Sequence, residues 1–223
     1  MVCGATGRSG GAVCRELLQD AQFPRVVCLG NSRAPAFGDA RADCRQQSLE
    51  ALANASSNPV GQSDSNDDGP AASAFEGVDT IFFCIGTQRK VAGKEGMRKL
   101  ELDDTVAAAK AAKAAGVSKC AIVTSKGAKA TSSMVYLATK GKVENELRAI
   151  GFEHLVTARP GFILDGDRGP ASGSCKAWCI GSVCCMATIN CEVVGRALAR
   201  ATLQAKEAVV VLENGDLLDL GGE

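Results

Sequence analysis

The sequence of 223 residues has little aromatic content, a single histidine and no excess of either charge. Phe, Trp and Tyr together make up 4% of it, and 25 acidic residues balance 25 basic ones. Such a chain lacks the field that attracts a nucleic acid or an anionic membrane, so we expect neither as a main partner. A general-base role is not expected for His154, the one histidine.

Long hydrophobic runs are also absent. A membrane-spanning helix needs about 20 apolar residues. The nearest candidate, 177–191, is shorter than this and rich in small and polar residues. No signal peptide is visible. We therefore expect no membrane span and a cytoplasmic protein.

The chain also has little room before its first motif. A glycine motif begins at Gly4, which leaves only Met1–Cys3 for the strand that should precede it. A strand of about five residues is usual. We expect that N-terminal residues are missing, and an organellar targeting peptide would be missing with them.

Cysteine is abundant by contrast, with 11 residues. Several stand within apolar runs, where a thiol behaves as a small buried hydrophobe, and a reducing compartment is expected. Five gather near the C-terminal end: Cys175, Cys179, Cys184, Cys185 and Cys191. They lack the CxxC pairs and nearby histidine that zinc sites favour, so no metal site is expected. Buried or interface thiols are the main interpretation, and redox sensing is the alternative.

Apolar runs alternate with helical patterns along the chain, which is typical of parallel βαβ units. The predicted fold class is α/β, a doubly wound, mostly parallel Rossmann sheet with a small C-terminal substrate-side segment. The length suits a single NAD(P)-binding domain over 1–223. Within it, residues 1–150 are expected to bind the cofactor and residues 151–223 to face the substrate.

The apolar and helical patterns place the elements as follows. Strands are expected at 1–3, 25–30, 79–86, 119–124, 155–158 and 208–212, with a weak third strand at 60–64 inside a polar loop. Helices are expected at 10–20, 94–115, 133–150 and 192–204. Gly116 and Gly151 follow two of these helices directly, a position typical of a C-cap.

A glycine triplet stands between the first strand and the first helix. Its glycines are Gly4, Gly7 and Gly10. In a dinucleotide-binding turn the first glycine permits the tight turn, the second lets the backbone approach the pyrophosphate, and the third lets helix and strand pack closely. The helix N-terminus then offers amides to the phosphates. The cofactor-binding residues expected here are Gly4, Thr6, Gly7, Arg8, Ser9 and Gly10.

The end of the second strand bears on the choice of dinucleotide. An acidic residue there would accept the ribose hydroxyl of NAD, but the strand ends in Leu29-Gly30-Asn31-Ser32-Arg33. Arg33 and Arg8 together suit a ribose phosphate. The sequence therefore favours NADPH over NADH, and the alternative is that both arginines are solvated surface residues.

The catalytic candidates include the single tyrosine of the chain. Tyr136 and Lys140 are four residues apart, which puts them on one face of a helix. An ammonium favours the phenolate form of a neighbouring phenol, which can then exchange a proton with a carbonyl or alcohol. Ser125 follows the fifth strand directly, where its hydroxyl can polarise a substrate carbonyl.

Four motifs occur in a fixed order along the chain. They are 83–87 (FCIGT), 124–128 (TSKGA), 136–141 (YLATKG) and 158–161 (ARPG), followed by 211–214 (VLEN). Together they resemble the Tat-interacting oxidoreductase family, which are atypical short-chain dehydrogenases/reductases. The resemblance covers nearly the whole chain and is strongest over 73–165.

The resemblance implies a Rossmann fold, NADPH and a Ser–Tyr–Lys set that matches Ser125, Tyr136 and Lys140. It also implies cofactor contacts by Gly86 and Thr87 near the adenosine, Asp64 near the adenine, and Pro160 and Gly161 beside the nicotinamide. One departure is that the family usually has basic residues where Asn31 and Ser32 stand here.

The function expected from these residues is NADPH-dependent oxidoreduction of a small carbonyl or alcohol substrate. Two alternatives stay open: a non-catalytic redox sensor or regulator that binds NADPH, and a scaffold subunit of a larger complex. A homodimer or a protein partner is compatible with all three.

Overall fold

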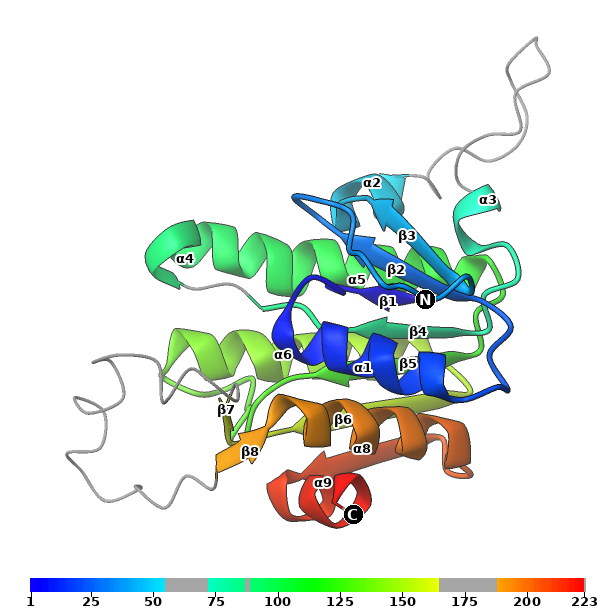
Figure 1. Cartoon of the computed structure of the whole chain (residues 1–223). Helices are drawn as coiled ribbons and strands as arrows, with labels where there is room; N and C mark the ends of the chain where they lie inside the picture. Colours follow the sequence, from blue (N-terminus) through cyan, green and yellow to red (C-terminus); the bar gives the residue numbers. More distant parts are fainter. Residues whose placement is uncertain (55–71, 87–88, 165–187, 223) are drawn as a thin grey trace, which may run out of the picture.

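The computed structural model describes residues 1–54, 72–86, 89–164 and 188–222, which form a parallel sheet with helices on both faces (Figure 1). The sheet has seven strands in the order β3-β2-β1-β4-β5-β6-β9, and every pairing is parallel. The strands are β1 (Val2–Cys3), β2 (Val26–Gly30), β3 (Ala42–Gln46), β4 (Thr80–Phe83), β5 (Lys119–Val123), β6 (His154–Arg159) and β9 (Val209–Glu213). The predicted doubly wound Rossmann fold is confirmed.

Helices cover both faces of this sheet. One face packs against α1 (Arg8–Gln19), α8 (Cys191–Gln204) and α9 (Asn214–Gly221), and the other against α2 (Leu49–Asn54), α5 (Thr105–Ala114) and α6 (Val135–Ile150). All residues of β2 and β4 are buried, because a parallel sheet with two covered faces has no solvent side. The carboxyl ends of the strands lie on the left of Figure 1, where α1 and α6 begin.

The predicted position of the third strand was wrong. The strand beside β2 is β3, which pairs with it from Val26–Ala42 to Gly30–Gln46, whereas 60–64 lies outside the described residues. Its sequence, ADCRQ, has no apolar run, because β3 is the edge strand and is only half-buried. Asp43 and Arg45 lie on the same face of this strand. Asp43 accepts hydrogen bonds from Arg45, at 2.5 Å, and from Arg25, which precedes β2, at 2.7 Å.

The long helix predicted over 94–115 is divided into three pieces. They are α4 (Arg89–Arg98), the π-helix η1 (Lys99–Asp104) and α5. Gly93, at φ +70°, interrupts α4. The side chain of Thr105 accompanies the wider π turn by donating to the carbonyl of Leu100, five residues earlier, at 2.9 Å. Hydrophobic spacing does not reveal such a turn, which adds one residue without ending the helix.

Besides β3, five elements were not predicted, and the first of them is α2, for which no helix was expected. A short α3 (Ala72–Phe75) precedes β4. A small parallel sheet joins β7 (Phe162–Leu164) to β8 (Thr188–Asn190). The helix α9 follows β9, so the helix expected at 192–204 is not the last. A reciprocal capping box starts α9, with the Glu213 side chain on the third backbone amide and the Asp216 side chain on the backbone amide of Glu213.

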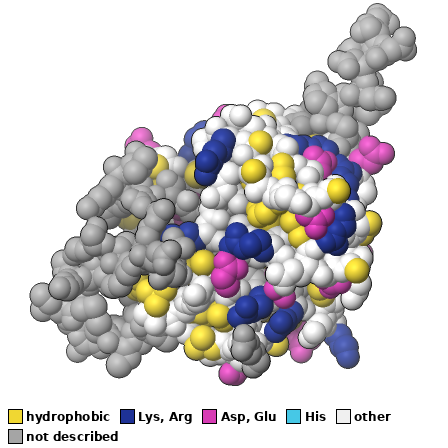
Figure 2. Space-filling model, in the orientation of Figure 1, with side chains coloured by type: hydrophobic (Ala, Val, Ile, Leu, Met, Phe, Trp, Pro, Cys, Tyr) yellow, Lys and Arg dark blue, Asp and Glu magenta, His cyan; other side chains and the backbone are white. Residues whose placement is uncertain are grey.

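The helices α1 and α8 approach each other closely. A Cβ atom added at Gly195 of α8 would lie 2.6 Å from the Cβ of Ala12 and 2.8 Å from the backbone nitrogen of Val13. Arg15 on α1 also pairs with Glu192 on α8. On the face drawn in Figure 2, basic and acidic side chains are interspersed, as the balanced composition suggests. In the described part of the chain, no helix is long and apolar enough to cross a bilayer.

Candidate dinucleotide-binding and catalytic site

The glycine loop forms the tight turn between β1 and α1 that its spacing predicts. Gly4 has φ +86°, which a residue with a side chain rarely adopts. The amides of Gly4 and Ala5 both donate to the carbonyl of Leu29 on β2, at 3.0 and 2.9 Å. A Cβ at Gly4 would lie 2.5 Å from the carbonyl oxygen of Cys84, so the first glycine packs directly on the chain that leaves β4.

The third glycine brings α1 against the turn. A Cβ at Gly10 would lie 2.2 Å from the carbonyl oxygen of Gly4, far inside any van der Waals contact. This close approach fixes the first turn of α1 above the end of β1. Gly4 and Gly10 therefore have the structural roles expected of the first and third glycines.

The N-terminus of α1 suits an anion. Gly7 is the N-cap, no side chain caps the helix, and the first turn holds no acidic residue. Thr6, Gly7 and Arg8 are exposed around this end, and Ser9 is half-buried. Uncapped amides at a helix start carry a partial positive charge and bind phosphate groups. A dinucleotide pyrophosphate fits this site, because the glycines carry no Cβ atom that would fill it and the helix start offers these amides.

The end of β2 folds back toward this loop. A Cβ at Gly30 would lie 2.1 Å from the carbonyl oxygen of Arg33 and 2.7 Å from the methyl group of Thr6. The structure thus brings the 31–33 segment beside the glycine loop. Asn31, Ser32 and Arg33 are all exposed, and Gln46 at the end of β3 donates to the carbonyl of Ser32 at 3.2 Å.

The loop after β5 and the start of α6 form one unit. The amide of Lys129 donates to the carbonyl of Leu137 at 3.1 Å. A Cβ at Gly141 would lie 2.2 Å from the backbone nitrogen of Ala130, so only glycine lets α6 approach this closely. Ser125, half-buried, begins the loop at the carboxyl end of β5, and its hydroxyl lies 3.4 Å from the carbonyl of Lys126.

Tyr136 and Lys140 face each other on the first turns of α6. The Nζ of Lys140 lies 5.9 Å from the centre of the Tyr136 ring. Tyr136 is 40% exposed, whereas Lys140 is 4% exposed. The Lys140 ammonium donates to the carbonyl of Ile85 at 3.2 Å, which places it beneath the chain leaving β4. The phenol is open to a substrate, and the ammonium is held behind it.

The charge partner of Lys140 was not predicted. Glu101, on the π-helix η1, has its Oε2 2.9 Å from the Nζ of Lys140, and both side chains are almost completely buried. In the sequence Glu101 is one of four acids within 95–104, and nothing distinguishes it from the exposed ones. Only the π turn, which buries Glu101 and Leu102 together, identifies it.

A second buried carboxylate ties α6 to three strand ends. Glu144 accepts from the Thr124 hydroxyl at 2.6 Å and from the Arg159 guanidinium at 2.5 Å. Arg159 also reaches Glu213 at 3.0 Å. Hydrogen bonding to Glu144, and then to Glu213, raises the pKa of the Arg159 guanidinium further above its ordinary value. These contacts hold α6 in one position against the carboxyl ends of the strands.

The turn after β6 is held from both sides. The carbonyl of Pro160 accepts from the amide of Lys126 at 2.8 Å. The amide of Gly161 donates to the side chain of Asn214 at 2.7 Å. Gly86 is exposed on the chain that leaves β4. Ser125, Tyr136, Pro160 and Gly161 therefore share the carboxyl edge of the sheet with the glycine loop.

Comparison with known proteins agrees with the predicted fold and with the geometry of the glycine loop. A family model described as NAD(P)H-binding matches residues 4–174. The chain belongs to the NAD(P)H-binding family. Nucleotide binding by this family and the Rossmann architecture agree with the loop geometry, and the match starts at the first glycine of the loop.

Two curated relatives of this NAD(P)H-binding chain agree with the family resemblance that its motifs indicated. Protein HTATIP2 of Rattus norvegicus is 29% identical over 163 residues, which cover 73% of this chain and 62% of that protein. Protein fmp52, mitochondrial, of Aspergillus clavatus is 30% identical over 239 residues, which cover 99% and 97%. The membership expected from the motifs is confirmed, although the match spans less than two thirds of HTATIP2.

The solved structures agree on the fold. The dTDP-glucose 4,6-dehydratase DesIV of Streptomyces venezuelae, solved with NAD and TYD bound, superposes with a TM-score of 0.69 at 17% identity. The alignment covers 98% of this chain and 79% of that one. At this identity the likeness shows the architecture of an NAD(P)H-binding domain and no substrate.

Some predicted site residues lie outside the described residues. They are Asp64 and Thr87; Cys175, Cys179, Cys184 and Cys185, which were interpreted as buried or interface thiols, also lie outside the described residues. Of the C-terminal cysteines Cys191 is described, and its side chain is buried. Across residues 1–54, 72–86, 89–164 and 188–222, no group of three His, Cys, Asp or Glu side chains is arranged to hold a metal ion.

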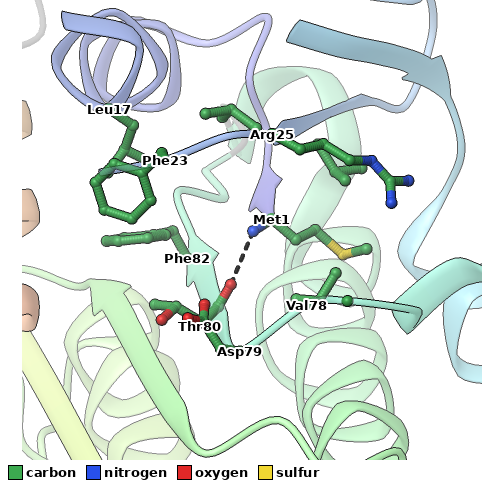
Figure 3. A pocket seen from close by; sticks show the side chains of 11 residues that line it. Met1, Leu17, Phe23, Arg25, Val78, Asp79, Thr80 and Phe82 are labelled. Carbon is green, nitrogen blue, oxygen red and sulfur yellow. Dashed lines mark hydrogen bonds between the residues drawn. The ribbon is translucent and has the colours of Figure 1, made fainter. Parts of the chain in front are cut away.

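One small cavity lies at the opposite end of the sheet from the glycine loop (Figure 3). Its volume is about 40 Å³, and its walls include Leu17, Phe23, Phe82 and the backbone amine of Met1. That amine donates to the carbonyl of Thr80 at 2.8 Å, and burial lowers its pKa. The cavity adjoins the amino ends of the strands, so it does not belong to the nucleotide site.

Proposed function

We propose that this protein is an NADPH-dependent oxidoreductase of the short-chain dehydrogenase type, acting on a small carbonyl or alcohol substrate. The observation that carries the proposal is the pairing of an exposed phenol, Tyr136, with a buried ammonium, Lys140, at 5.9 Å, on the sheet edge that also holds the glycine loop. A glycine loop alone supports nucleotide binding, and the Tyr–Lys pair adds a means of proton transfer.

The roles of the chain's own residues follow from their positions. A nicotinamide cofactor, when bound, supplies or accepts the hydride. The Tyr136 hydroxyl gives a proton to the substrate oxygen in reduction and takes it back in oxidation. Ser125 donates a hydrogen bond to that oxygen and orients it. Lys140 stabilises the phenolate form of Tyr136 and donates to the nicotinamide ribose.

The cofactor would lie along the carboxyl edge of the sheet. The loop residues Gly4, Thr6, Gly7, Ser9 and Gly10 would cradle the pyrophosphate. We propose that Gly86, Thr87 and Asp64 contact the adenosine and that Pro160 and Gly161 contact the nicotinamide. Residues 1–150 would provide most of this site, and residues 151–223 would provide the substrate side of the same domain.

The preference for NADPH rests on two arginines. Arg8 starts α1, and the carbonyl of Arg33 packs against Gly30 beside Thr6, which brings both residues to the same end of the loop. No acid follows β2 to accept the ribose hydroxyl of NAD. Calorimetric titration with NADPH, NADH and NADP⁺ tests the choice. Arg33→Ala should weaken NADPH binding at least tenfold, a loss of about 1.4 kcal/mol, and leave NADH binding unchanged.

The catalytic part has its own test. Tyr136→Phe removes one oxygen atom from an exposed side chain, so it should keep the fold and the affinity for NADPH. Removing a general acid–base typically costs about 10²- to 10⁴-fold in rate. Reduction of a panel of small aldehydes and ketones, followed by NADPH absorbance, measures this loss. Full activity in Tyr136→Phe, or binding without turnover by the wild type, would favour the redox-sensor alternative.

Location and assembly belong to the same proposal. The fungal relative carries "mitochondrial" in its name, which supports an organellar location over the cytoplasmic one expected from the sequence. Imaging of the tagged natural protein in cells distinguishes the two. A homodimer or a protein partner is tested by sedimentation with and without NADPH.

A further inference from the structure

We propose that Glu101 is a positioning residue that acts through Lys140, holding its ammonium in place and balancing its charge behind Tyr136. This inference rests on the proposed function, in which Lys140 tunes Tyr136 and binds the ribose. It adds a residue that belongs neither to the Ser–Tyr–Lys set nor to the glycine loop.

The pair is buried from both sides. The side chains of Lys140 and Glu101 are 5% and 1% exposed, and their charged atoms lie 2.9 Å apart. Lys140 comes from α6 and Glu101 from η1, so the pair joins two helices on one face of the sheet. Removing a single ion from water costs several kcal/mol, and a partner in close contact offsets that cost. The close contact of the two charges therefore offsets part of the cost of burying each of them.

Other ionisable groups around the ammonium are already accounted for. Directly after β4, the Cys84 thiol is close, but burial raises its pKa, so it stays neutral. On η1, Asp104 binds Lys99 at 2.9 Å, and Asp103 lies 3.7 Å from Arg98. On α6, Glu144 is engaged by Thr124 and Arg159. Glu101 is thus the counter-charge of Lys140 in the described part of the site.

Two contacts restrict the position of the ammonium. An ammonium has three N–H groups. One is donated to the carbonyl of Ile85 at 3.2 Å, and Glu101 Oε2 lies 2.9 Å from the nitrogen as its ionic partner. These contacts, from the chain after β4 and from η1, hold Nζ in place behind Tyr136. In the proposed complex, an N–H group of the ammonium would donate to a hydroxyl of the nicotinamide ribose.

The π turn explains how an acid reaches this position. Glu101 and Leu102 are consecutive and both buried, and the wider turn closes with the Thr105 side chain on the Leu100 carbonyl. Single π turns inside α-helices occur often at functional sites. Here the turn places the Glu101 carboxylate on the buried side of the helix, next to the Lys140 ammonium.

The balance of charge sets how strongly Lys140 acts on Tyr136. A compensated ammonium stabilises a neighbouring phenolate less than a free one, because the carboxylate opposes it. Glu101→Gln removes that opposition with almost no change in size. The Tyr136 phenolate should then form at lower pH than in the wild type.

The single tyrosine makes this measurable without cofactor or substrate. The chain has one tyrosine, so the ultraviolet absorbance of tyrosinate reports on Tyr136 alone. We expect Glu101→Gln to move the midpoint of tyrosinate formation down by about 1 pH unit and Lys140→Met to move it up by a similar amount. Glu101→Asp, which keeps the charge, should restore most of the wild-type curve. The matched control is Asp103→Asn, an exposed acid of the same π-helix, which should leave the curve unchanged.

A second readout guards against loss of folding. Glu101→Gln and Lys140→Met each leave one buried charge alone, while the double variant leaves none. The double variant should therefore lose less stability in denaturant unfolding than the sum of the losses in the two single variants. If Glu101→Gln does not fold, a folded double variant still supports the pairing, and additive losses overturn it.

The outcomes separate this inference from the proposed function. A tyrosinate curve in Glu101→Gln that matches the wild type, while Lys140→Met shifts it, overturns the role of Glu101. Calorimetry with NADPH addresses the proposed function independently: absence of binding by the wild type would refute that function whatever the tyrosine titration shows. When the wild type does bind, Glu101→Gln should weaken NADPH binding at least tenfold and Asp103→Asn should not.

Discussion

A Gly10→Ala substitution should damage the phosphate loop, because the added methyl group has no space. The new Cβ would lie 2.2 Å from the carbonyl oxygen of Gly4 and 2.7 Å from its carbonyl carbon. Both neighbours are backbone atoms, which cannot rotate away as a side chain would. To reach ordinary contact at 3.4 Å, α1 and the turn must separate by about 1 Å.

The expected magnitude combines two opposing effects. Overpacking of this kind costs about 1–3 kcal/mol. Alanine gains up to about 1 kcal/mol over glycine inside a helix. The net destabilisation should reach up to about 2 kcal/mol, which lowers the melting temperature by up to roughly 8 °C in a chain of this size. The displaced amides should also lose at least tenfold in NADPH affinity, or about 1.4 kcal/mol.

The next residue provides a matched control. A Cβ at Gly11 would meet the carbonyl oxygen of Ala5 and the Arg15 side chain, each at 3.4 Å, in the same helix. Gly11→Ala should therefore keep or slightly raise stability and bind NADPH like the wild type. Thermal unfolding and calorimetric titration of both variants test the comparison. Equal stability and equal affinity in the two variants would refute the close-approach argument.

Three further predictions concern other parts of the fold. Glu144→Gln breaks a buried ion pair and should lower the free energy of unfolding in urea by about 3–5 kcal/mol. The control Glu146→Gln, at an exposed position of the same helix, should leave it almost unchanged. Similar urea midpoints in the two variants would contradict the Glu144 network. Gly195→Ala should destabilise the protein by about 1–3 kcal/mol through the α1–α8 contact, and Gly215→Ala, which has open space around it, should not; two equally stable variants would show that these helices can move apart. Hydrogen bonds from its arginine partners lower the pKa of Asp43 from 3.8 to about 2, so its stabilising effect is complete above pH 3.8 and is lost as the pH falls through that value toward 2. Asp43→Asn should remove this pH dependence of the free energy of unfolding, which amounts to less than about 1 kcal/mol because the pair is partly exposed. An unchanged pH dependence in the variant would argue against the ion pair.

The parts of the fold that were predictable share one property: the pattern that marks them is local. The glycine spacing, the buried run at 79–86 and the Tyr136–Lys140 interval each follow from residues within one element. Residues at the carboxyl ends of parallel strands meet at one edge, so Ser125 and Gly161 could be assigned to the same site from their positions after predicted strands. Their contacts with a cofactor or a substrate stay predictions.

The parts that were missed depend on partners far away in sequence. The strand β3 is held by pairing with β2 and by Arg25, which lies 18 residues from Asp43, and its own residues carry no strand pattern. The Glu101–Lys140 pair joins two helices through a π turn that hydrophobic spacing cannot detect. The helix α9 was detectable, because the Glu213–Asp216 capping box is a local signal that precedes it.

The close packing of α8 on α1 has a consequence for the order in which the chain can mature on the ribosome. The helix next to the phosphate loop is synthesised long before α8, yet Val13 and Leu17 share their apolar cluster with Val194 and Leu198 of α8. A nascent chain that has emerged only to residue 150 leaves that side of α1 open to water or to a chaperone. The loop therefore gains its final rigidity only after α8 has emerged, and a truncation before α8 should abolish nucleotide binding from a distance.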